Sequence, residues 1–381
     1  MNLHDRIDAV RKGMAAEGVG LLIAASSGLH SLDRPDPVCY LTDYRSIGES
    51  LFLLFQSGAA ILIVSPAADA DRVASRYTAS ASVATDDVFD AMQATLAGRQ
   101  AAAASIATAN IASLPYRLAQ RIFSFDGSAA RDFDDALYCL GECKTGDEIE
   151  HARKATAIAE KAFERLLETA HPGLPECELA VELNCYTESL GAEDNFLMLS
   201  ASPHARAVTP SSARRIERGD VLLAELSPNF EGQFSQICRT VSIGTPRREL
   251  QEKYDLAVRA MWAGIEKIRP GIRASEVCHA IDRVFEAAGY VEYCRPPHMR
   301  RRGHGLGCGS VAPGDIAADN HTLLEEGMVF VVHPNQYIPE AGYLLCGEPV
   351  RVTATGVETL SKRTAELGVV DARRSGFAPC A

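Results

Sequence analysis

The sequence lacks the features of several protein classes. It has no Cys-x-x-Cys pair, and its eleven cysteines are scattered and odd in number, which argues against a zinc ribbon or a disulfide framework. No run of residues approaches the ~20 apolar positions of a membrane-spanning helix. Charged side chains in MNLHDRIDAVRKGM stand where a signal peptide has its apolar core. We therefore expect a reduced, cytoplasmic enzyme with no membrane partner.

No basic stripe offsets the acidity of the chain. It has 38 Lys and Arg against 50 Asp and Glu, and its formal net charge is −12. An acidic surface repels phosphate backbones, so we expect no nucleic-acid partner. The hydrophobic fraction of 47% is ordinary for a globular protein and excludes disorder of the whole chain. A small-molecule substrate is the partner class that remains.

The length of 381 residues indicates two domains, because single cores usually stop growing near ~250–300 residues. Thr145 and Glu148 have the spacing of a capping box ahead of a long Ala-rich helix, so a second domain begins there. We predict an N-terminal domain over 1–140, a catalytic domain over 145–368 and a C-terminal tail over 369–381.

A carboxylate stands in an apolar strand pattern, GDVLLAEL (219–226). If this strand and 232–244 form a hairpin centred between Phe230 and Glu231, then Glu225 faces Gln236 on the same side of the sheet. A buried carboxylate needs polar partners, which would indicate a site. The alternative is a charge on an exposed strand edge, which is equally compatible with the pattern.

A second pair of polar residues lies in MVFVVHPNQYIPEAGYLLCGEPVRVT (328–353). If a turn is centred between Glu340 and Ala341, His333 and Glu348 face each other. A further histidine, His304, stands between two glycines in GHG, where the backbone can approach a ligand closely. Two facing polar pairs and this histidine in one domain favour an active site over a set of structural residues.

The order and spacing of these segments resemble the pita-bread superfamily of methionine aminopeptidases, aminopeptidase P, prolidase and creatinase. CYLTDYRS (39–46) is similar to a segment of the small N-terminal domain of creatinase-type members, and ECKTGDEIEHARKA to the usual start of their catalytic domain. The resemblance implies an α+β fold, in which a pita-bread catalytic domain follows a smaller creatinase-type N-terminal α/β domain.

The metallopeptidases of this superfamily use two Asp, one His and two Glu, which bridge two divalent metals. Matched position by position, this chain has Glu225, Gln236, His304, His333 and Glu348. Only two carboxylates remain, which disfavours a dinuclear site. We therefore expect no cofactor, as in the metal-independent branch of creatinase and ectoine hydrolase. The alternative is one divalent ion held by Glu225, His304, His333 and Glu348.

This likeness favours a hydrolase that cleaves a non-peptide C–N bond (an amidine, guanidine or cyclic amide) in a small cationic or zwitterionic metabolite. Glu225 is the predicted base or nucleophile, Glu348 holds the cationic nitrogen, and His304 and His333 shuttle protons. Two alternatives stay open. One is a mononuclear-metal hydrolase or lyase, similar to Xaa-Pro peptidases or to dimethylsulfoniopropionate lyase. The other is an inactive binding module.

Other residues complete the predicted site. The loop SPHARAVTPSSARRIERGD (202–220) resembles the one that brings a histidine into the superfamily's site, which makes His204 a catalytic candidate. Gln236, Glu49, Arg295 and His298 are candidates for substrate binding. Glu49 stands near a position where creatinases carry an arginine, and a solvated loop charge is the alternative. The resemblance also implies a homodimer.

Cys238, Cys308 and Cys346 lie beside the motif segments. One of them could be a nucleophile or a thiolate ligand. A buried cysteine is more often a small hydrophobic residue, and we favour that interpretation.

Overall fold

The computed structural model describes residues 3–29, 32, 35–97, 105–125, 131–308, 313–363 and 365–371. It divides into two compact units. Unit 1 is Met1–Asp147 with Cys308–Ala312, and unit 2 is Glu148–Gly307 with Pro313–Ala381. Each unit has its own sheet and its own apolar core. In the described parts of the chain, no helix is long and apolar enough to cross a membrane.

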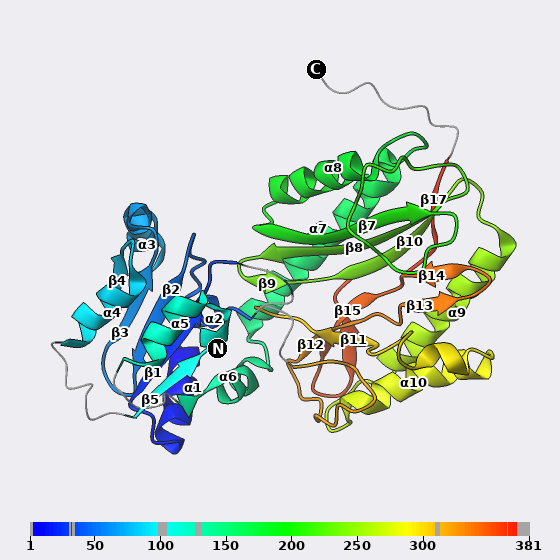
Figure 1. The fold of residues 1–381 in the computed structure, drawn as a ribbon. Coiled ribbons are helices and arrows are strands. Elements are labelled where there is room, and N and C mark those ends of the chain that lie inside the picture. The colour runs from blue at the N-terminus through cyan, green and yellow to red at the C-terminus, as the bar shows by residue number, and fades with distance from the viewer. Residues whose placement is uncertain are drawn as a thin grey trace. The chain divides into compact units, whose positions relative to one another are not determined.

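Unit 1 is built on a six-stranded mixed sheet in the order β4-β3-β2-β1-β5-β6 (Figure 1). Alternate residues of its central strands belong to two different apolar clusters, with Leu22 and Phe52 in one and Ile23 and Leu53 in the other. Successive side chains of a strand point to opposite faces, so both faces of this sheet are covered. The strands are β1 (Leu21–Ser26), β2 (Ser50–Phe55), β3 (Ala60–Val64), β4 (Ala81–Ala84), β5 (Ile106–Ala109) and β6 (Arg131–Asp132).

Helices on the two faces of this sheet complete its clusters. Val10 and Met14 of α1 pack with the first cluster, and Met92 of α4 with the second. The helices are α1 (Leu3–Ala16), α2 (Pro37–Thr42), α3 (Ala70–Arg76), α4 (Val88–Ala97), α5 (Tyr116–Phe123) and α6 (Asp134–Gly141), with short 3-10 turns η1 (Ala67–Asp69) and η3 (Ile111–Ser113).

The described residues of unit 2 form three sheets, in the orders β17-β10-β8-β7 with β9 paired to β8, β11-β12-β15-β16, and β13-β14. The first sheet carries β7 (Asp194–Ser202), β8 (Val221–Phe230), β9 (Gln233–Phe234), β10 (Ile237–Ile243) and β17 (Gly368–Val370). The others carry β11 (Gly303–Gly305), β12 (Val329–Val332), β13 (Gln336–Ile338), β14 (Gly342–Leu344), β15 (Glu348–Val352) and β16 (Val357–Thr359).

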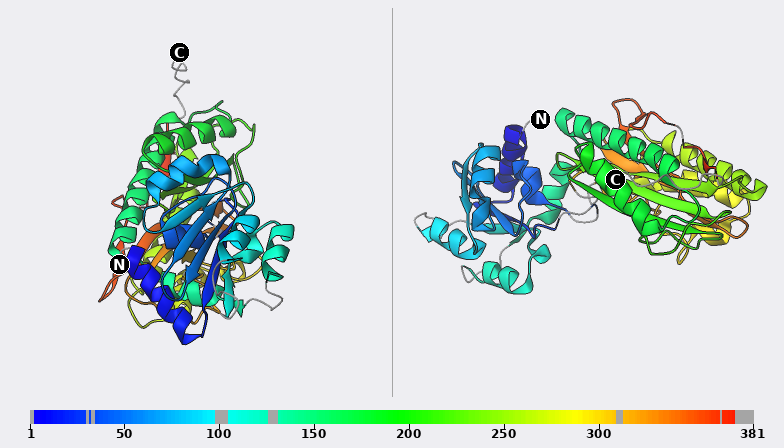
Figure 2. Two further views of the ribbon diagram at one scale, coloured as in Figure 1. Left: turned by 90° about the vertical axis from the view of Figure 1, so that its left-hand side faces the viewer. Right: turned by 90° about the horizontal axis from the view of Figure 1, so that it is seen from above.

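Helices cover the first sheet of unit 2, and two further helices pack against each other (Figures 1 and 2). Phe163 of α7 and Leu183 of α8 join the core of the β7-β8-β10 sheet. Between the two further helices, a Cβ on Gly264 would lie 2.6 Å from Ile281, so this glycine lets them approach closely. The helices are α7 (Gly146–Thr169), α8 (Glu176–Ser189), α9 (Arg248–Ile265), α10 (Ala274–Ala287) and the 3-10 turn η4 (Val291–Cys294).

The predicted register of the first hairpin is wrong. Glu225 of β8 pairs with Cys238 of β10, not with Gln236. The same register continues through β9, where Phe230 pairs with Gln233. The turn is therefore the dipeptide Glu231–Gly232, whose φ angles of 46° and 79° are both positive. A two-residue turn of this kind favours glycine and matches the strand twist, and it shifts the turn centre by one residue from the predicted position.

The second predicted pair is also out of register, by one residue. Glu348 of β15 pairs with Val332 of β12, and the β13–β14 hairpin closes through the three residues that follow Ile338. A shift of one residue moves a side chain to the opposite face of a strand. His333 is consequently aligned with Gly347, and the predicted facing of His333 and Glu348 is wrong.

The predicted C-terminal tail begins too early. Val369 and Val370 belong to β17, which pairs in parallel with Ser242 and Ile243 of β10. Val370 is buried in the unit 2 core. A buried residue that alternates with its neighbour is typical of a strand with one covered face, which explains why this segment forms one. Residues 372–381 of the predicted tail lie outside the described residues.

Candidate active site

Two sheets of unit 2 meet at the predicted site. The backbone groups of Cys238 and Gly347 exchange hydrogen bonds of 3.2 and 3.1 Å, which joins β10 to the start of β15. A Cβ on Gly347 would lie 2.6 Å from the Cβ of His333 and 3.0 Å from that of Cys238. Because Cys238 is paired with Glu225, the contact brings Glu225, Cys238 and His333 into one region.

Glu225 is half-buried and receives a hydrogen bond from an amide. The Nδ2 atom of Asn335 donates to Glu225 Oε1 at 3.2 Å. The Oδ1 atom of the same amide accepts from the backbone N–H of Cys346 at 3.2 Å, so the amide is held with its donor toward Glu225. Burial, and then the charge of Glu225, raise the pKa of the Cys238 thiol and of the Tyr343 phenol.

His304 and His333 form a buried imidazole pair, with ring centroids 5.2 Å apart. His304 Nδ1 lies 3.0 Å from the carbonyl oxygen of Gly305. Burial lowers the pKa of His333 well below its usual range, and His304 and Arg301 act in the same direction. His333 is therefore neutral near pH 7, and its buried Nδ1 has no hydrogen-bond partner among the described residues.

Glu348 belongs to a buried ion pair. Its Oε1 lies 2.8 Å from Arg239 Nη2, and the side chains of Glu348 and Arg239 are 2% and 0% exposed. Arg239 also donates to the carbonyl oxygen of Gly347 at 2.7 Å, and Ser361 donates to the other oxygen of Glu348. Burial raises the pKa of Glu348, while Arg239 and Ser361 act against that rise. These contacts connect β10 and β15, which is a scaffold role rather than the predicted contact with a substrate nitrogen.

Two of the predicted substrate-binding residues lie in quite different surroundings. Gln236 is 2% exposed, and its Oε1 has no hydrogen-bond partner in the described part of the chain. Glu49 belongs to unit 1, where it accepts a hydrogen bond of 3.3 Å from Ser65. Of these two residues, only Gln236 is thus in the same unit as Glu225.

His204 and His298 converge on one tyrosine. The rings of His204 and His298 lie 6.0 and 6.4 Å from that of Tyr337, and the second pair is stacked. His204 Nε2 also lies 2.9 Å from the carbonyl oxygen of Pro339. Arg295 is exposed, and its carbonyl oxygen accepts a hydrogen bond of 2.9 Å from the backbone N–H of His298. We call the group the aromatic rim: His204, Tyr293, His298, Tyr337 and Tyr343, the last being paired with Tyr337 across β13 and β14.

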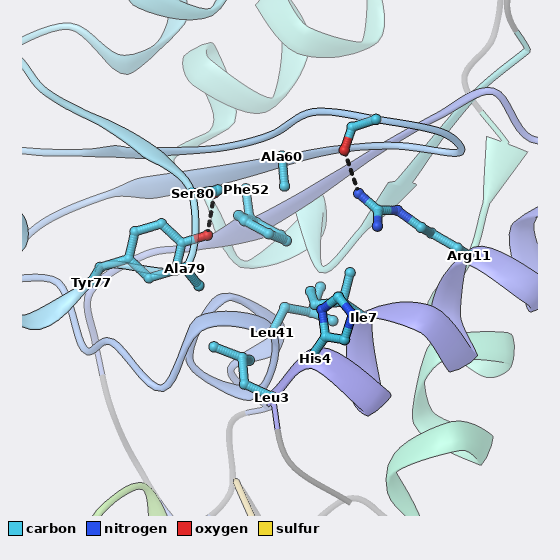
Figure 3. Close-up of a pocket in the computed structure, with 11 residues that line it drawn as sticks. Leu3, His4, Ile7, Arg11, Leu41, Phe52, Ala60, Tyr77, Ala79 and Ser80 are labelled. Atoms are coloured by element: carbon cyan, nitrogen blue, oxygen red, sulfur yellow. Dashed lines mark hydrogen bonds between the residues drawn. The ribbon is translucent and has the colours of Figure 1, made fainter.

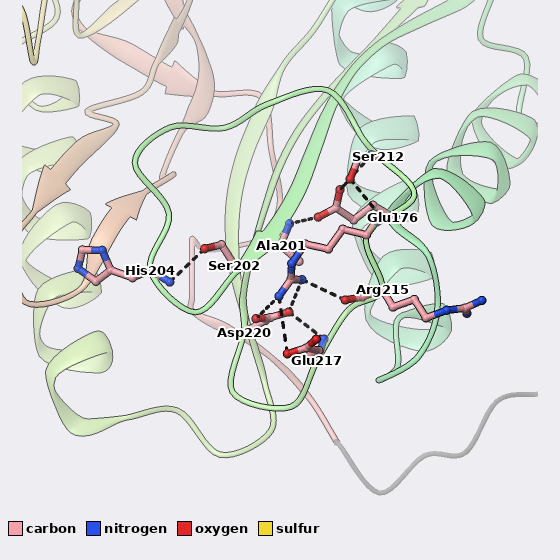
Figure 4. Close-up of polar contacts among 9 residues, drawn as sticks. Glu176, Ala201, Ser202, His204, Ser212, Arg215, Glu217 and Asp220 are labelled. Atoms are coloured by element: carbon pink, nitrogen blue, oxygen red, sulfur yellow. Dashed lines mark hydrogen bonds and ion pairs between the residues drawn. The ribbon is translucent and has the colours of Figure 1, made fainter.

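The loop that carries His204 is anchored by two buried carboxylates, which sequence reasoning missed (Figure 4). Glu176 accepts from the backbone N–H of Ala201 at 2.7 Å and from the Ser212 hydroxyl at 2.7 Å. Asp220 accepts from Arg214 at 2.6 Å. The signal available in the sequence was an acidic residue at the first position of a helix and another directly before a strand.

A cavity of about 530 Å³ lies in unit 1 (Figure 3). Its walls include Ile7, Phe52 and Tyr77, and Arg11 at its edge donates to the carbonyl oxygen of Gly58 at 2.8 Å. None of the predicted site residues lines it. We therefore place the candidate active site in unit 2.

The order of these elements agrees with a known family. Residues 150–358 match the model of metallopeptidase family M24, which is more than half of the chain. The chain belongs to family M24. An uncharacterised peptidase of Staphylococcus aureus (strain USA300) is 31% identical over 252 residues, or 64% of this chain and 70% of that protein. An Xaa-Pro dipeptidase of Pyrococcus furiosus is 31% identical over 240 residues, or 62% and 68%.

Solved structures show the same fold. The prolidase from Pyrococcus horikoshii OT3 has a TM-score of 0.82 at 22% identity, over 95% of this chain and 99% of that one. The X-Pro aminopeptidase from Thermotoga maritima MSB8 has a TM-score of 0.81 at 20% identity, over 96% and 99%. The predicted superfamily and the α+β fold with a pita-bread domain are confirmed.

Membership of M24 contradicts the expectation that the enzyme has no cofactor. M24 is a family of metallopeptidases, and its member from Pyrococcus furiosus is an Xaa-Pro dipeptidase. The expectation rested on a count of carboxylates, and such a count does not outweigh the metal dependence of a whole family. The prediction of a cofactor-free enzyme is therefore wrong, because it conflicts with the metal dependence of the family to which the chain belongs.

The residues of this chain nevertheless do not fit the two-metal set of the M24 peptidases. Gln236 supplies a neutral amide, and Glu348 is paired with Arg239. Within the ranges that the structure describes, no group of three or more His, Cys, Asp or Glu could hold a metal ion. The alternative single-metal set of Glu225, His304, His333 and Glu348 is therefore not assembled.

Proposed function

We propose that this M24 hydrolase cleaves an amide C–N bond in a dipeptide-sized substrate, with Glu225 as the general base. One observation carries the proposal. A half-buried carboxylate, oriented by Asn335, lies in the same region as a buried imidazole pair whose His333 is neutral. A base and neutral hydrogen-bonding groups are what the hydrolysis of a C–N bond requires.

The substrate class follows from the relatives and from the aromatic rim. The relative from Pyrococcus furiosus is an Xaa-Pro dipeptidase, so Xaa-Pro dipeptides are the first substrates to test. Tyr293 and Tyr337 are half-buried in the rim. Such aromatic faces give apolar contact area to a small ring, which supports a role in holding a proline ring.

The proposed reaction uses groups of this chain. Glu225 takes a proton from a water molecule, and the resulting hydroxide attacks the carbonyl carbon. The C–N bond then breaks, and the proton passes from Glu225 to the leaving nitrogen. His333 is neutral, so its imidazole can donate an N–H to a developing negative charge, and His304 lies beside it.

A second candidate is the hydrolysis of an amidine, guanidine or cyclic amide. The observation that favours it is Gln236 Oε1, a buried acceptor with no hydrogen-bond partner among the described residues. Amidines and guanidines present several N–H donors in one plane, and a buried acceptor without a donor costs about 1–3 kcal/mol. A substrate N–H would satisfy this oxygen.

The deciding experiment is a substrate panel on the purified full chain. Xaa-Pro dipeptides are tested beside guanidino acids and cyclic amidines, each with a chelator and with added Mn²⁺. Hydrolysis of Xaa-Pro dipeptides supports the first candidate, and hydrolysis of the guanidino compounds supports the second. Glu225→Gln should lower kcat about 100-fold or more, whereas the exposed Glu217→Gln should not change it. Near-normal turnover by Glu225→Gln would exclude Glu225 as the base.

A further inference from the structure

A pair of cysteines lies outside the candidate active site, in unit 1. Cys39 belongs to α2, and Cys308 follows β11. Their thiols are joined by a hydrogen bond. The backbone holds the same two segments together, because Asp36 N–H donates to the carbonyl oxygen of Cys308 at 3.4 Å, and Asp36 Oδ1 accepts from Cys39 N–H at 2.9 Å. Two cysteines that are distant in sequence are thus held in contact by more than their side chains.

The two thiols differ in access to solvent. Cys39 is 5% exposed, whereas Cys308 is half-exposed. The thiolate is the reactive form of cysteine, and reaction also needs access to the reagent. A dissolved reagent therefore reaches Cys308 first, with Cys39 already beside it.

We propose that Cys39 and Cys308 form a reversible disulfide by exchange with a low-molecular-weight disulfide such as glutathione disulfide. In the first step the Cys308 thiolate attacks one sulfur of the glutathione disulfide, its S–S bond breaks, and one glutathione thiolate leaves. In the second step the Cys39 thiol loses its proton, and its sulfur attacks the Cys308 sulfur and displaces the second glutathione. Two protein thiols are oxidised, and one glutathione disulfide is reduced to two glutathiones.

The surroundings of Cys39 support this order. The hydrogen bond to Cys308, and then burial, raise the pKa of the Cys39 thiol well above its usual range. A hydrogen bond that raises a thiol pKa is one that this thiol donates, so Cys39 stays protonated and does not make the first attack. Cys308 therefore reacts first, and Cys39 gives up its proton only at the second step.

Other cysteines of the chain are either fully buried or exposed on the surface. Cys238 and Cys346 are fully buried, and burial raises the pKa of each thiol. Cys177 and Cys185 are exposed on α8, which makes them controls for simple surface modification. Selective linkage of Cys39 to Cys308 would therefore report the contact between them.

The test is peptide mapping by mass spectrometry without reduction, after the full chain has been incubated with glutathione disulfide and quenched in acid. The wild type should yield a Cys39–Cys308 linked peptide pair that dithiothreitol removes. Cys39→Ser should instead accumulate glutathione on Cys308, because the second thiol is missing. Cys177→Ser should form the same link as the wild type.

Two results would overturn the proposal. One is a wild type that keeps glutathione on Cys308 as the Cys39→Ser variant does. The other is a link that joins Cys308 to a different cysteine. Because Cys39→Ser places a hydroxyl in a buried position, Cys39→Ala is the second variant, and it should trap the same Cys308 adduct in a chain whose reduced form has the unfolding temperature of the wild type.

Discussion

Single residues decide what the site can do. Gly347 is aligned with His333, and the space beside its Cα is filled by the Cβ atoms of His333 and Cys238. Glu348, one residue later, is turned to Arg239. Two consecutive residues thus have different roles, since Gly347 contacts His333 of the site and Glu348 stabilises the scaffold.

Glu348→Gln should destabilise the protein strongly. It leaves the fully buried Arg239 without a carboxylate, and removing one partner of a buried ion pair costs about 3–5 kcal/mol. The measurement is the free energy of unfolding in urea. Glu358→Gln is the control, since Glu358 pairs with Arg153 at a half-exposed site, where a pair contributes about 0–1 kcal/mol. Equal effects of the two variants would contradict the scaffold role, as would the loss of kcat in folded Glu348→Gln.

Gly347→Ala should lower activity while Gly356→Ala should not. The added methyl group would press on the Cβ atoms of His333 and Cys238, which belong to stiff backbone and cannot move aside. A displacement of about 1 Å in an active site can lower turnover roughly 100-fold. A Cβ on Gly356 meets no atom within 4 Å. The measurement is kcat on the best substrate of the panel, and unchanged kcat for Gly347→Ala would show that His333 is not held by this contact.

At the scale of elements, the loop over 202–220 connects β7 to β8 and presents His204 to the aromatic rim. Its fixed points are the carboxylates of Glu176 and Asp220, both 2% exposed. A loop with anchors of this kind can hold a histidine at its start in one position.

Glu176→Ala should free this loop. It removes the acceptor for the backbone N–H groups of Ala201 and Ser212, so the loop should exchange its amide hydrogens faster and be cut sooner by trypsin at Arg206 and Arg214. Hydrogen exchange and limited proteolysis measure both effects. Glu178→Ala, exposed on the same helix, should leave both rates unchanged. A loop equally protected in both variants would show that other contacts hold it.

Patterns along the chain predicted which segments form strands and helices, because burial and capping are local. They could not predict register, because it depends on the conformation of a few turn residues. The turn at Glu231–Gly232 shifts the first pairing by one residue from the predicted register, and the three-residue turn after Ile338 shifts the second. The contact of Asn335 with Glu225 follows from both registers, so no single pattern in the sequence contained it.

At the scale of the whole molecule, the two units carry separate cores and can be followed separately. The chain has one tryptophan, Trp262, which lies on α9 in unit 2. Its fluorescence therefore reports on unit 2, while circular dichroism reports on both units. An unfolding step that appears in circular dichroism but not in Trp262 fluorescence therefore reports the unfolding of unit 1.

Asp69→Asn should reduce the acid sensitivity of unit 1. Burial raises the pKa of Asp69, but hydrogen bonds from Arg72 and Tyr44 outweigh it and hold the pKa below its ordinary value. Since the folded pKa is the lower one, the ionised carboxylate stabilises unit 1 above ~pH 4, and this stabilisation is lost as the pH falls further. Asp69→Asn should cost about 2 kcal/mol at pH 7 and show a shallower loss of stability in acid.

The measurement is urea unfolding by circular dichroism between neutral and acid pH, with Trp262 fluorescence alongside. Asp71→Asn, exposed on α3, is the control and should follow the wild type. Identical pH profiles for Asp69→Asn and the wild type would contradict the role of this carboxylate.

The homodimer implied by the superfamily remains a prediction. Light scattering coupled to size-exclusion chromatography should give about twice the 41.0 kDa mass of the chain. A mass of one chain across a range of protein concentrations would contradict it.

The crowding at Gly347 has an evolutionary consequence. Any mutation that put a side chain at this position would collide with the Cβ atoms of His333 and Cys238, so it would be harmful until one of them had also changed. Changing His333 first would open a gap beside Cys238 and break the imidazole pair. Each single step toward a larger residue at position 347 thus passes through a damaged intermediate. The present site is entrenched, and selection can refine it far more easily than it can reverse it.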